Sequence, residues 1–264
     1  MQISSNHTRH NPSFQKQYCT KKADDIVRHT RNNFPMTSPS YAVDFWMIFE
    51  NLKTKQNYEK LIKVFKKMGE TIKIMRSNGQ LSPNNPIFDE TIEKAKDLKT
   101  GNCAEYCNLT LATLFANGCT SANFCMPAIE VKILDKNDKE IFTHYQTCDH
   151  LVVNAKIKNP NNNIKKNVIL DTWLGKAMSV EEAKEEYKRL FYEKGKQQAK
   201  IEAKQKFLKD FPSVPQFLSF IDECKFKTRF CLVSIKDLEF PNDDAACLGK
   251  ALAEKYPKLI MENY

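Results

Sequence analysis

Apolar residues in the first half of the chain recur at helical spacing. Over residues 41–76 the recurrence runs mostly in steps of three and four, which predicts a helical segment with one apolar face. Residues 77–86 are rich in turn formers and end that pattern. Two shorter helices are predicted beyond it, at residues 87–98 and 103–116, with an interruption at residues 100–102.

Past Gly118 the pattern changes to the alternation that is typical of strands. Apolar and charged residues alternate over residues 128–134, which predicts a strand. The later predicted elements are strands at 139–143, 147–155, 167–171 and 226–235, and helices at 179–207 and 244–255. Helices followed by a run of strands, then helices with one late strand, indicate an α+β fold in which helices pack on an antiparallel sheet.

Domain organisation can be inferred from composition along the chain. Residues 1–39 carry three His, three Pro and several Asn and Ser, so we expect a polar, flexible arm. No repeat and no linker divides the rest of the chain, and residues 40–264 are therefore predicted to form a single domain. Hydrophobic residues make up 41% of the chain, which excludes a disordered protein. No apolar run approaches the roughly 18 residues that span a bilayer, so no transmembrane segment is expected.

The charge balance favours acidic partners. Lys and Arg number 41 against 32 Asp and Glu, a formal charge of +9. A field of that sign favours an acidic protein, an anionic surface or nucleic acid. The basic residues are densest at 51–76 and 184–209, but no aromatic RNA-binding signature or zinc-finger spacing accompanies them, so no specific nucleic acid recognition is expected. Ordinary solvated helix faces are the alternative interpretation.

Nine cysteines are many for a chain of 264 residues. Residues 1–22 are polar and lack the apolar core of a signal peptide, so free thiols in a reducing compartment are the default expectation. No Cys-x-x-Cys pair exists and only five His are present, so no zinc site and no other cofactor is predicted. Most of these cysteines are interpreted as small buried hydrophobes.

One cysteine has a different setting, in the segment Gly-Asn-Cys-Ala-Glu at 101–105. Asn102 and Glu105 have the spacing of a capping box, which predicts that Cys103 is the first residue of a helix. A thiol there lies at the positive end of the helix dipole, which favours the thiolate. Cys103 is therefore a candidate nucleophile. An ordinary capped helix with a core cysteine is the alternative, because capping boxes are common.

A nucleophilic thiol needs a base, and His144 and His150 are the candidates outside the polar arm. His150 leads into the apolar residues 151–153, where an imidazole can be held in one orientation, so we predict His150 to be the base. Asp171 ends a later apolar strand and is predicted to orient that imidazole, with Trp173 covering the pair. A structural His and an Asp that caps the next turn are the alternatives.

The three residues together resemble a known superfamily. Cys, His and Asp succeed one another 47 and 21 residues apart, in the order of the papain-like and transglutaminase-like Cys-His-Asp enzymes. Three motifs over roughly residues 95–175 resemble those of bacterial secreted effectors: Gly-Asn-Cys-x-Glu, Asp-His followed by hydrophobic residues, and a hydrophobic strand that ends in Asp-x-Trp. Thr172 stands where that family often has Pro. The resemblance implies a papain-like core with Cys103 as nucleophile, His150 as general base and acid, and Asp171 as orienter.

The resemblance also implies a function. It indicates a thiol hydrolase that acts on a host protein substrate, as a cysteine peptidase or a glutamine deamidase, and that reaches the host cell cytoplasm without an N-terminal signal peptide. The oxyanion hole would use the Cys103 N–H and either Asn102 or Gln80. Two alternatives stay open. One is a transglutaminase or acyltransferase with the same triad, and the other is a non-enzymatic protein whose basic helices bind an acidic partner or a membrane surface.

Overall fold

The structure is a computed structural model, and it describes residues 12–36, 88–99, 101–148, 150–159, 164–235 and 242–262. The helices are α1 (Pro12–Asn33), α4 (Phe88–Leu98), α5 (Cys103–Ala116), α6 (Val180–Phe207), α7 (Val214–Glu223) and α8 (Asn242–Lys255), with short 3-10 turns at Leu208–Asp210 and Pro257–Leu259. The strands are β1 (Ala122–Leu134), β2 (Glu140–Thr147), β3 (Val152–Lys158), β4 (Lys165–Asp171), β5 (Lys176–Ser179) and β6 (Lys225–Ser234).

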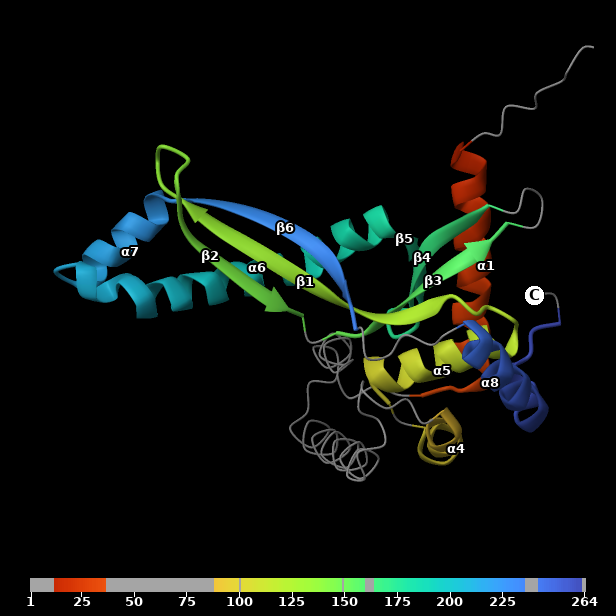
Figure 1. The fold of residues 1–264 in the computed structure, drawn as a ribbon. Helices are drawn as coiled ribbons and strands as arrows, with labels where there is room; N and C mark the ends of the chain where they lie inside the picture. Colours follow the sequence, from red (N-terminus) through yellow and green to blue (C-terminus); the bar gives the residue numbers. More distant parts are fainter. Residues whose placement is uncertain are drawn as a thin grey trace, which may run out of the picture. The chain divides into compact units, whose positions relative to one another are not determined.

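These elements make an α+β fold of helices on a mostly antiparallel sheet (Figure 1). The strand order is β2-β1-β3-β4-β5, and β6 pairs with β1. The chain divides into two compact units. The first unit comprises Met1–Phe124, Val152–Ser179 and Lys236–Tyr264, and the second comprises Cys125–Leu151 and Val180–Ile235. The predicted α+β class is therefore confirmed.

The first unit is built around α5. Strands β3, β4 and β5 pair antiparallel, with Val153 opposite Leu170 and Val168 opposite Ser179. Helix α1 packs on β4 and β5, α5 contacts β3, and α4 and α8 pack on α5 (Figure 1). Every residue from Glu105 to Phe115 is buried as a result. Helix α5 is thus an interior helix of this unit.

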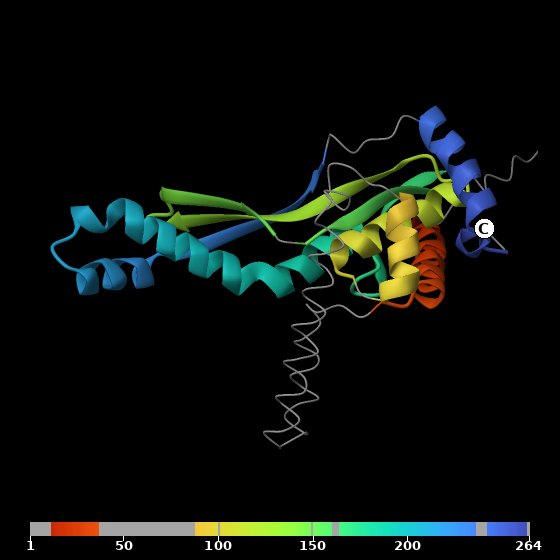
Figure 2. The ribbon, with the colours of Figure 1, turned by 90° about the horizontal axis from the view of Figure 1, so that it is seen from below.

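The second unit is a one-sided sheet. Strand β1 pairs antiparallel with β2 on one edge and with β6 on the other. Its residues Ile129, Val131 and Ile133 are fully buried and form a core with residues of α6 and α7, which lie along the sheet in Figure 2. The intervening Glu130 and Lys132 are part-exposed on the opposite face. Antiparallel sheets commonly face water on one side in this way.

Most predicted elements are present. Helix α5 has the predicted bounds, and α4, α6, α8, β4 and β6 agree to within two residues. The turn between β1 and β2 is held by the Asp135 carboxylate, which accepts the N–H groups of Asn137 at 2.8 Å and Lys139 at 2.9 Å. Asp138 there has φ +62, a value that Asp tolerates better than most residues.

Other predictions differ from the structure. Within the arm predicted at residues 1–39, residues 12–33 form α1, in which Cys19, Ala23 and Ile26 recur at helical spacing and are buried. Strand β1 begins at Ala122, six residues before the predicted start, and β3 begins only at Val152. Helix α7 and the four-residue β5 were not predicted.

Two further predictions stay open. The helix predicted at residues 41–76 lies outside the described residues. That residues 40–264 make one catalytic domain remains a prediction. Within the described ranges, no helix is both long and apolar enough to cross a membrane.

Candidate functional site

Cys103 is the first residue of α5, as the capping pattern predicts. The Glu105 carboxylate accepts the Asn102 N–H at 2.7 Å, and the Tyr106 N–H bonds the Asn102 carbonyl at 3.1 Å. A Cβ on Gly101 would lie 2.9 Å from the Cβ of Glu105 and 2.6 Å from the Met36 sulfur, so a larger residue just before the cap would displace neighbouring side chains. Cys103 itself is only part-buried, whereas the helix behind it is fully buried. The thiol is thus held by a rigid, internal helix.

Five of the other cysteines are buried, whereas Cys224 and Cys231 are part-buried like Cys103. Burial raises the pKa of the Cys19, Cys119 and Cys224 thiols, and it raises the pKa of Cys148 to about 11. Such thiols stay protonated at neutral pH and react slowly. All nine cysteines are free, and Cys247 is exposed, so it is the thiol most able to compete with Cys103 for an electrophile.

His150 lies between β2 and β3 in the second unit, and it is buried. Its N–H donates to the Cys148 carbonyl at 2.7 Å, and its ring lies 5.8 Å from the Tyr187 ring and 6.4 Å from the Phe191 ring, centroid to centroid. Both aromatic residues belong to α6. The imidazole is therefore packed in one orientation by aromatic side chains, as a base requires and as a structural His would also be.

His144 has a different environment. It lies inside β2, on the face covered by α6. Its Nδ1 is 2.8 Å from a Glu202 carboxylate oxygen, and its Nε2 is 3.3 Å from the Gln146 amide oxygen. Both ring nitrogens thus have partners within the second unit. These partners favour a structural role for His144.

Asp171 ends β4 in the first unit and is 1% exposed. One of its carboxylate oxygens accepts the Leu174 N–H at 2.9 Å, so this residue does cap the turn after the strand. A carboxylate can accept hydrogen bonds on both oxygens, so turn capping is compatible with orienting an imidazole. The turn itself is fixed to α5, because the Thr172 and Thr110 hydroxyls are 2.6 Å apart.

Within the first unit, Cys103 and Asp171 are linked through that hydroxyl pair. Thr110 lies two turns along α5 from Cys103, about 10 Å at 1.5 Å per residue, and on the same side of the helix. Cys103 and Asp171 belong to the first unit and His150 to the second. That the three converge remains a prediction. Gln80 lies outside the described residues, while Asn102 occupies the N-cap of α5.

Arg31 of α1 is a positioning residue that the sequence interpretation missed. Its guanidinium donates to the carbonyls of Thr172 and Trp173, at 3.3 Å each, and lies 5.9 Å from the Tyr106 ring centroid. Gly175 has φ +73, and a Cβ there would come within 2.5 Å of the same guanidinium. The turn after Asp171 is therefore held from α1. The signal that could have found it is Gly175, two residues after the Asp-x-Trp motif.

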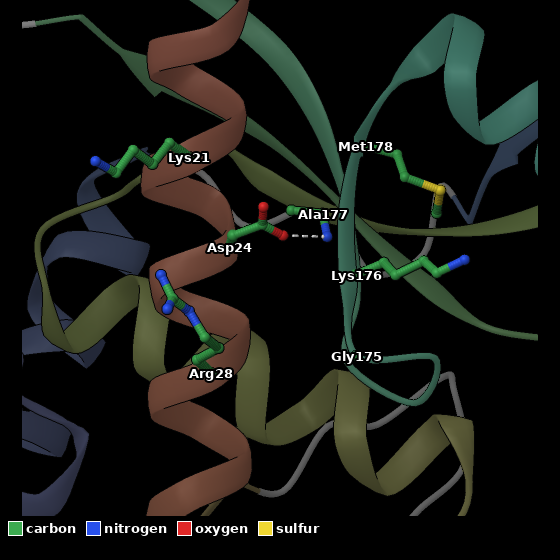
Figure 3. A pocket seen from close by; sticks show the side chains of 7 residues that line it. All are labelled: Lys21, Asp24, Arg28, Gly175, Lys176, Ala177 and Met178. Atoms are coloured by element: carbon green, nitrogen blue, oxygen red, sulfur yellow. Dashed lines mark hydrogen bonds between the residues drawn. The ribbon is translucent and has the colours of Figure 1, made fainter.

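A pocket of about 540 Å³ lies beside this turn, between α1 and β5 (Figure 3). Asp24 points across it and accepts the Ala177 N–H at 2.7 Å, with Lys21, Arg28 and Lys176 around it. None of Cys103, His150 and Asp171 lines this pocket. It is therefore separate from the candidate catalytic residues.

Several lysines of α6, the basic helix within the described residues, contact other side chains of the second unit. Lys196 and Lys200 lie 5.1 and 5.4 Å from the Phe226 ring centroid, and Lys206 lies 5.4 Å from that of Phe142. Lys200 also pairs with Asp222 at 3.2 Å. These contacts favour the interpretation of α6 as an ordinary amphipathic helix. One face packs on its own sheet, and the lysine-rich face is solvated. The other basic stretch, residues 51–76, lies outside the described residues.

No group of three or more His, Cys, Asp or Glu in the described ranges is arranged to hold a metal ion. Comparison of the chain with protein-family models, with curated proteins and with solved structures gave no match.

Proposed function

We propose that this protein is a thiol hydrolase that acts on a protein substrate, with Cys103 as nucleophile, His150 as general base and acid, and Asp171 as the group that orients the imidazole. The observation that carries the proposal is the position of Cys103. It is a part-exposed thiol at the N-terminus of an interior helix, with the cap held by Glu105. The N-terminus of a helix is also the end at which its dipole stabilises a bound anion, such as the oxyanion of an acyl-transfer intermediate.

The proposed reaction is acyl transfer through a thioester. The Cys103 thiolate attacks the substrate carbonyl carbon, and the oxyanion is stabilised by the Cys103 N–H with a second donor. Protonated His150 gives its proton to the leaving amine as the carbon–nitrogen bond breaks. His150 then takes a proton from water, the resulting hydroxide attacks the thioester, and the carboxylic acid leaves as the thiolate is restored. No metal ion or organic cofactor takes part.

A peptide bond is the first candidate substrate and a glutamine carboxamide the second. The formal charge of +9 favours an acidic protein over a small amine or a coenzyme as the bound partner. Transfer of the acyl group to an amine, as in a transglutaminase or acyltransferase, is the alternative outcome for the same thioester. The resemblance to secreted effectors makes host proteins the place to look for the substrate.

The first experiment measures the reactivity of Cys103. Iodoacetamide at neutral pH is expected to modify Cys103 faster than any buried cysteine, and the Cys247→Ser background removes the exposed competitor. Cys107→Ala is the matched control, because Cys107 lies one turn further along α5 and is buried. The assignment is wrong if Cys103 is unreactive while another cysteine is labelled first.

The second experiment identifies the reaction. Wild-type protein and Cys103→Ala are incubated with host-cell lysate, and the products are followed by mass spectrometry. New peptide termini indicate a peptidase, a gain of about one dalton on Gln indicates a deamidase, and amine adducts on Gln indicate transfer. Parallel assays of His150→Ala and His144→Ala test the base. Activity that survives loss of His150 but not of His144 would contradict the assignment.

The second candidate function is a non-enzymatic protein whose basic helices bind an acidic partner or a membrane surface, with Asp171 in a structural role. The hydrogen bond that Asp171 accepts from the Leu174 N–H is what a purely structural carboxylate would make. In that case the wild-type protein should show no turnover, and Asp171→Asn should leave partner binding unchanged. For the hydrolase, by analogy with serine proteases, the same change should lower kcat by up to ~10⁴ because the wrong imidazole tautomer is favoured.

A further inference from the structure

A second pocket in the first unit is lined by four lysines. It has a volume of about 160 Å³, and its basic residues are Lys22 of α1, Lys156 and Lys158 of β3, and Lys165 of β4. The hydroxyl residues Thr120 and Ser121 complete the polar lining. None of the described residues that line it is acidic, in contrast with the pocket of Figure 3, where Asp24 lies among the basic groups.

The sheet register concentrates positive charge at this pocket. Lys158 and Lys165 are directly opposite each other where β3 and β4 pair, and Lys156 is two residues from Lys158 on the same face of β3. Like charges directly opposite each other on paired strands are destabilising, because their Cβ atoms are only about 5 Å apart. Two other strand lysines have carboxylate partners, since Lys132 contacts Glu140 at 2.6 Å and Lys225 contacts Asp138 at 2.8 Å. Lys132 is also directly opposite Lys227, but its contact with Glu140 offsets that like charge.

The electrostatic effect of these lysines extends to the pocket floor. Cys119, a buried lining residue, has a pKa raised by burial, while Lys165 and Lys22 act in the opposite direction on its thiol. The floor itself is fixed by backbone: the Lys156 N–H donates to the Ser121 carbonyl at 2.8 Å, and the Cys119 N–H donates to the Leu114 carbonyl at 2.9 Å. The lysines therefore surround a backbone that is already ordered.

We propose that this pocket binds a phosphoryl group, and that Lys156, Lys158 and Lys165 neutralise it. Lys ammonium groups are point-charge donors that suit phosphate, and three or four of them match a dianion or a pyrophosphate. The volume selects a small head group, because pockets that enclose whole drug-sized molecules are about 300–1,000 Å³. The phosphoryl group belongs either to a soluble phosphate compound or to a lipid head group. The pocket is separate from Cys103, His150 and Asp171, so this inference does not depend on the proposed hydrolase.

Titration calorimetry with inorganic pyrophosphate tests the pocket directly. Wild-type protein is expected to show saturable binding, and the double variant Lys158→Gln with Lys165→Gln to bind at least about tenfold more weakly, since charge-assisted bonds are lost. The matched control is Lys188→Gln with Lys209→Gln, two exposed lysines of the second unit, which removes the same charge and should keep the affinity within about twofold. The proposal is overturned if wild type shows no saturable binding below ~10 mM, or if the two double variants lose the same affinity.

Two further measurements keep the test interpretable. Circular dichroism establishes that the double variant folds; if it does not, Lys156→Gln, a single change at an exposed position, replaces it. Flotation with phosphatidylcholine vesicles that contain phosphatidic acid separates the two sources of the phosphoryl group. Binding that pyrophosphate reverses identifies a lipid head group, and pyrophosphate binding without vesicle binding identifies a soluble phosphate compound. Vesicle binding that pyrophosphate and the double variant leave unchanged would contradict the pocket.

Discussion

Helices α5 and α6 differ in how much of their surface is buried, and each is typical of the unit to which it belongs. Helix α5 has 11 consecutive buried residues, from Glu105 to Phe115. Helix α6 is twice as long, at 28 residues, but buries only one stripe, made of Ala183, Tyr187, Gly195, Ala199 and Ala203. The first unit encloses its central helix, whereas the second lays a helix along one face of a sheet.

The difference shows in how polar side chains are satisfied. The buried hydroxyls of Thr110 and Thr113 donate to carbonyls of their own helix, at 2.7 and 2.8 Å, because no water reaches them. In the second unit, polar residues of the sheet pair at the surface, as Lys132 does with Glu140. The first unit is therefore stabilised mainly by packing around an interior helix. The second is stabilised by an amphipathic helix that covers one face of a sheet. Substitutions should accordingly cost more in the first unit.

The largest expected effect is at Gly249 of α8. A Cβ there would collide with the Phe115 carbonyl of α5, and backbone cannot move aside. We expect Gly249→Ala to lower the free energy of unfolding by about 3 kcal/mol, measured by urea denaturation. The matched variant in the second unit is Gly195→Ala, where the Cβ would meet the end of the Ile129 side chain at 2.5 Å. Its cost should be about 1 kcal/mol or less, since Ala also favours the helix. Equal costs would contradict the comparison.

The next effect is a pH dependence from Cys148. Burial raises the pKa of its thiol from 9.0 to about 11, so the folded state favours the protonated form. The stability from this group is fully present below pH 9 and is lost as the pH rises through 11. We expect a loss of at most about 2 kcal/mol across that window. Urea denaturation at pH 8 and pH 10.5 measures it, and the loss should be smaller in Cys148→Ala. An unchanged slope in that variant would show that other groups cause the loss.

The Thr172–Thr110 bond gives a smaller effect. The Thr110 hydroxyl donates to the Tyr106 carbonyl, so the Thr172 hydroxyl is the donor to Thr110. We expect Thr172→Val to cost about 1 kcal/mol in the free energy of unfolding, because one buried bond is lost. Thr143→Val on β2 is the control, since its bond to Glu140 is exposed and should cost almost nothing. A similar cost for both would mean that burial does not decide the value of these bonds.

The smallest effect is at Glu202 of α6. Hydrogen bonds from Gln198 and His144 lower the pKa of its carboxyl, so its contribution is present above the usual pKa and is lost as the pH falls through the lowered value. The side chain is 38% exposed, so we expect only a few tenths of a kcal/mol. Thermal unfolding between pH 3 and pH 6 should show a slightly flatter profile for Glu202→Gln than for Glu185→Gln. Identical profiles would show that the Glu202–His144 pair does not contribute to the stability of the second unit.

The sequence could predict elements whose signals are local. Helix α5 needs only Asn102 and Glu105 to define its start, and β1 needs only the alternation around Val131, so both were found. Strand β5 has four residues and no periodicity to detect. Helix α1 was missed because the His, Pro, Asn and Ser residues of 1–39 favour an irregular arm, although Cys19, Ala23 and Ile26 within it recur at helical spacing.

The candidate site likewise combines features that local sequence predicts with features that only tertiary structure determines. The position of Cys103 at a helix N-terminus and the burial of Asp171 at a strand end are local consequences of the residues around them, and both are present. The hydrogen bonds from Arg31 to the turn after Asp171 join segments more than 140 residues apart. No local sequence pattern encodes such a contact. Convergence with His150 depends on tertiary structure in the same way, so it stays a prediction.

The division of the chain has a consequence for its synthesis. The second unit is made of two separate chain segments, Cys125–Leu151 and Val180–Ile235. Segments of the first unit lie before, between and after them in the sequence. A ribosome would therefore deliver α5 more than 120 residues before α8, the helix that packs over Phe115. Until then one apolar side of α5 stays open in the nascent chain, where chaperones could bind it. Packing of α8 on α5 can therefore take place only after both segments of the second unit have been synthesised.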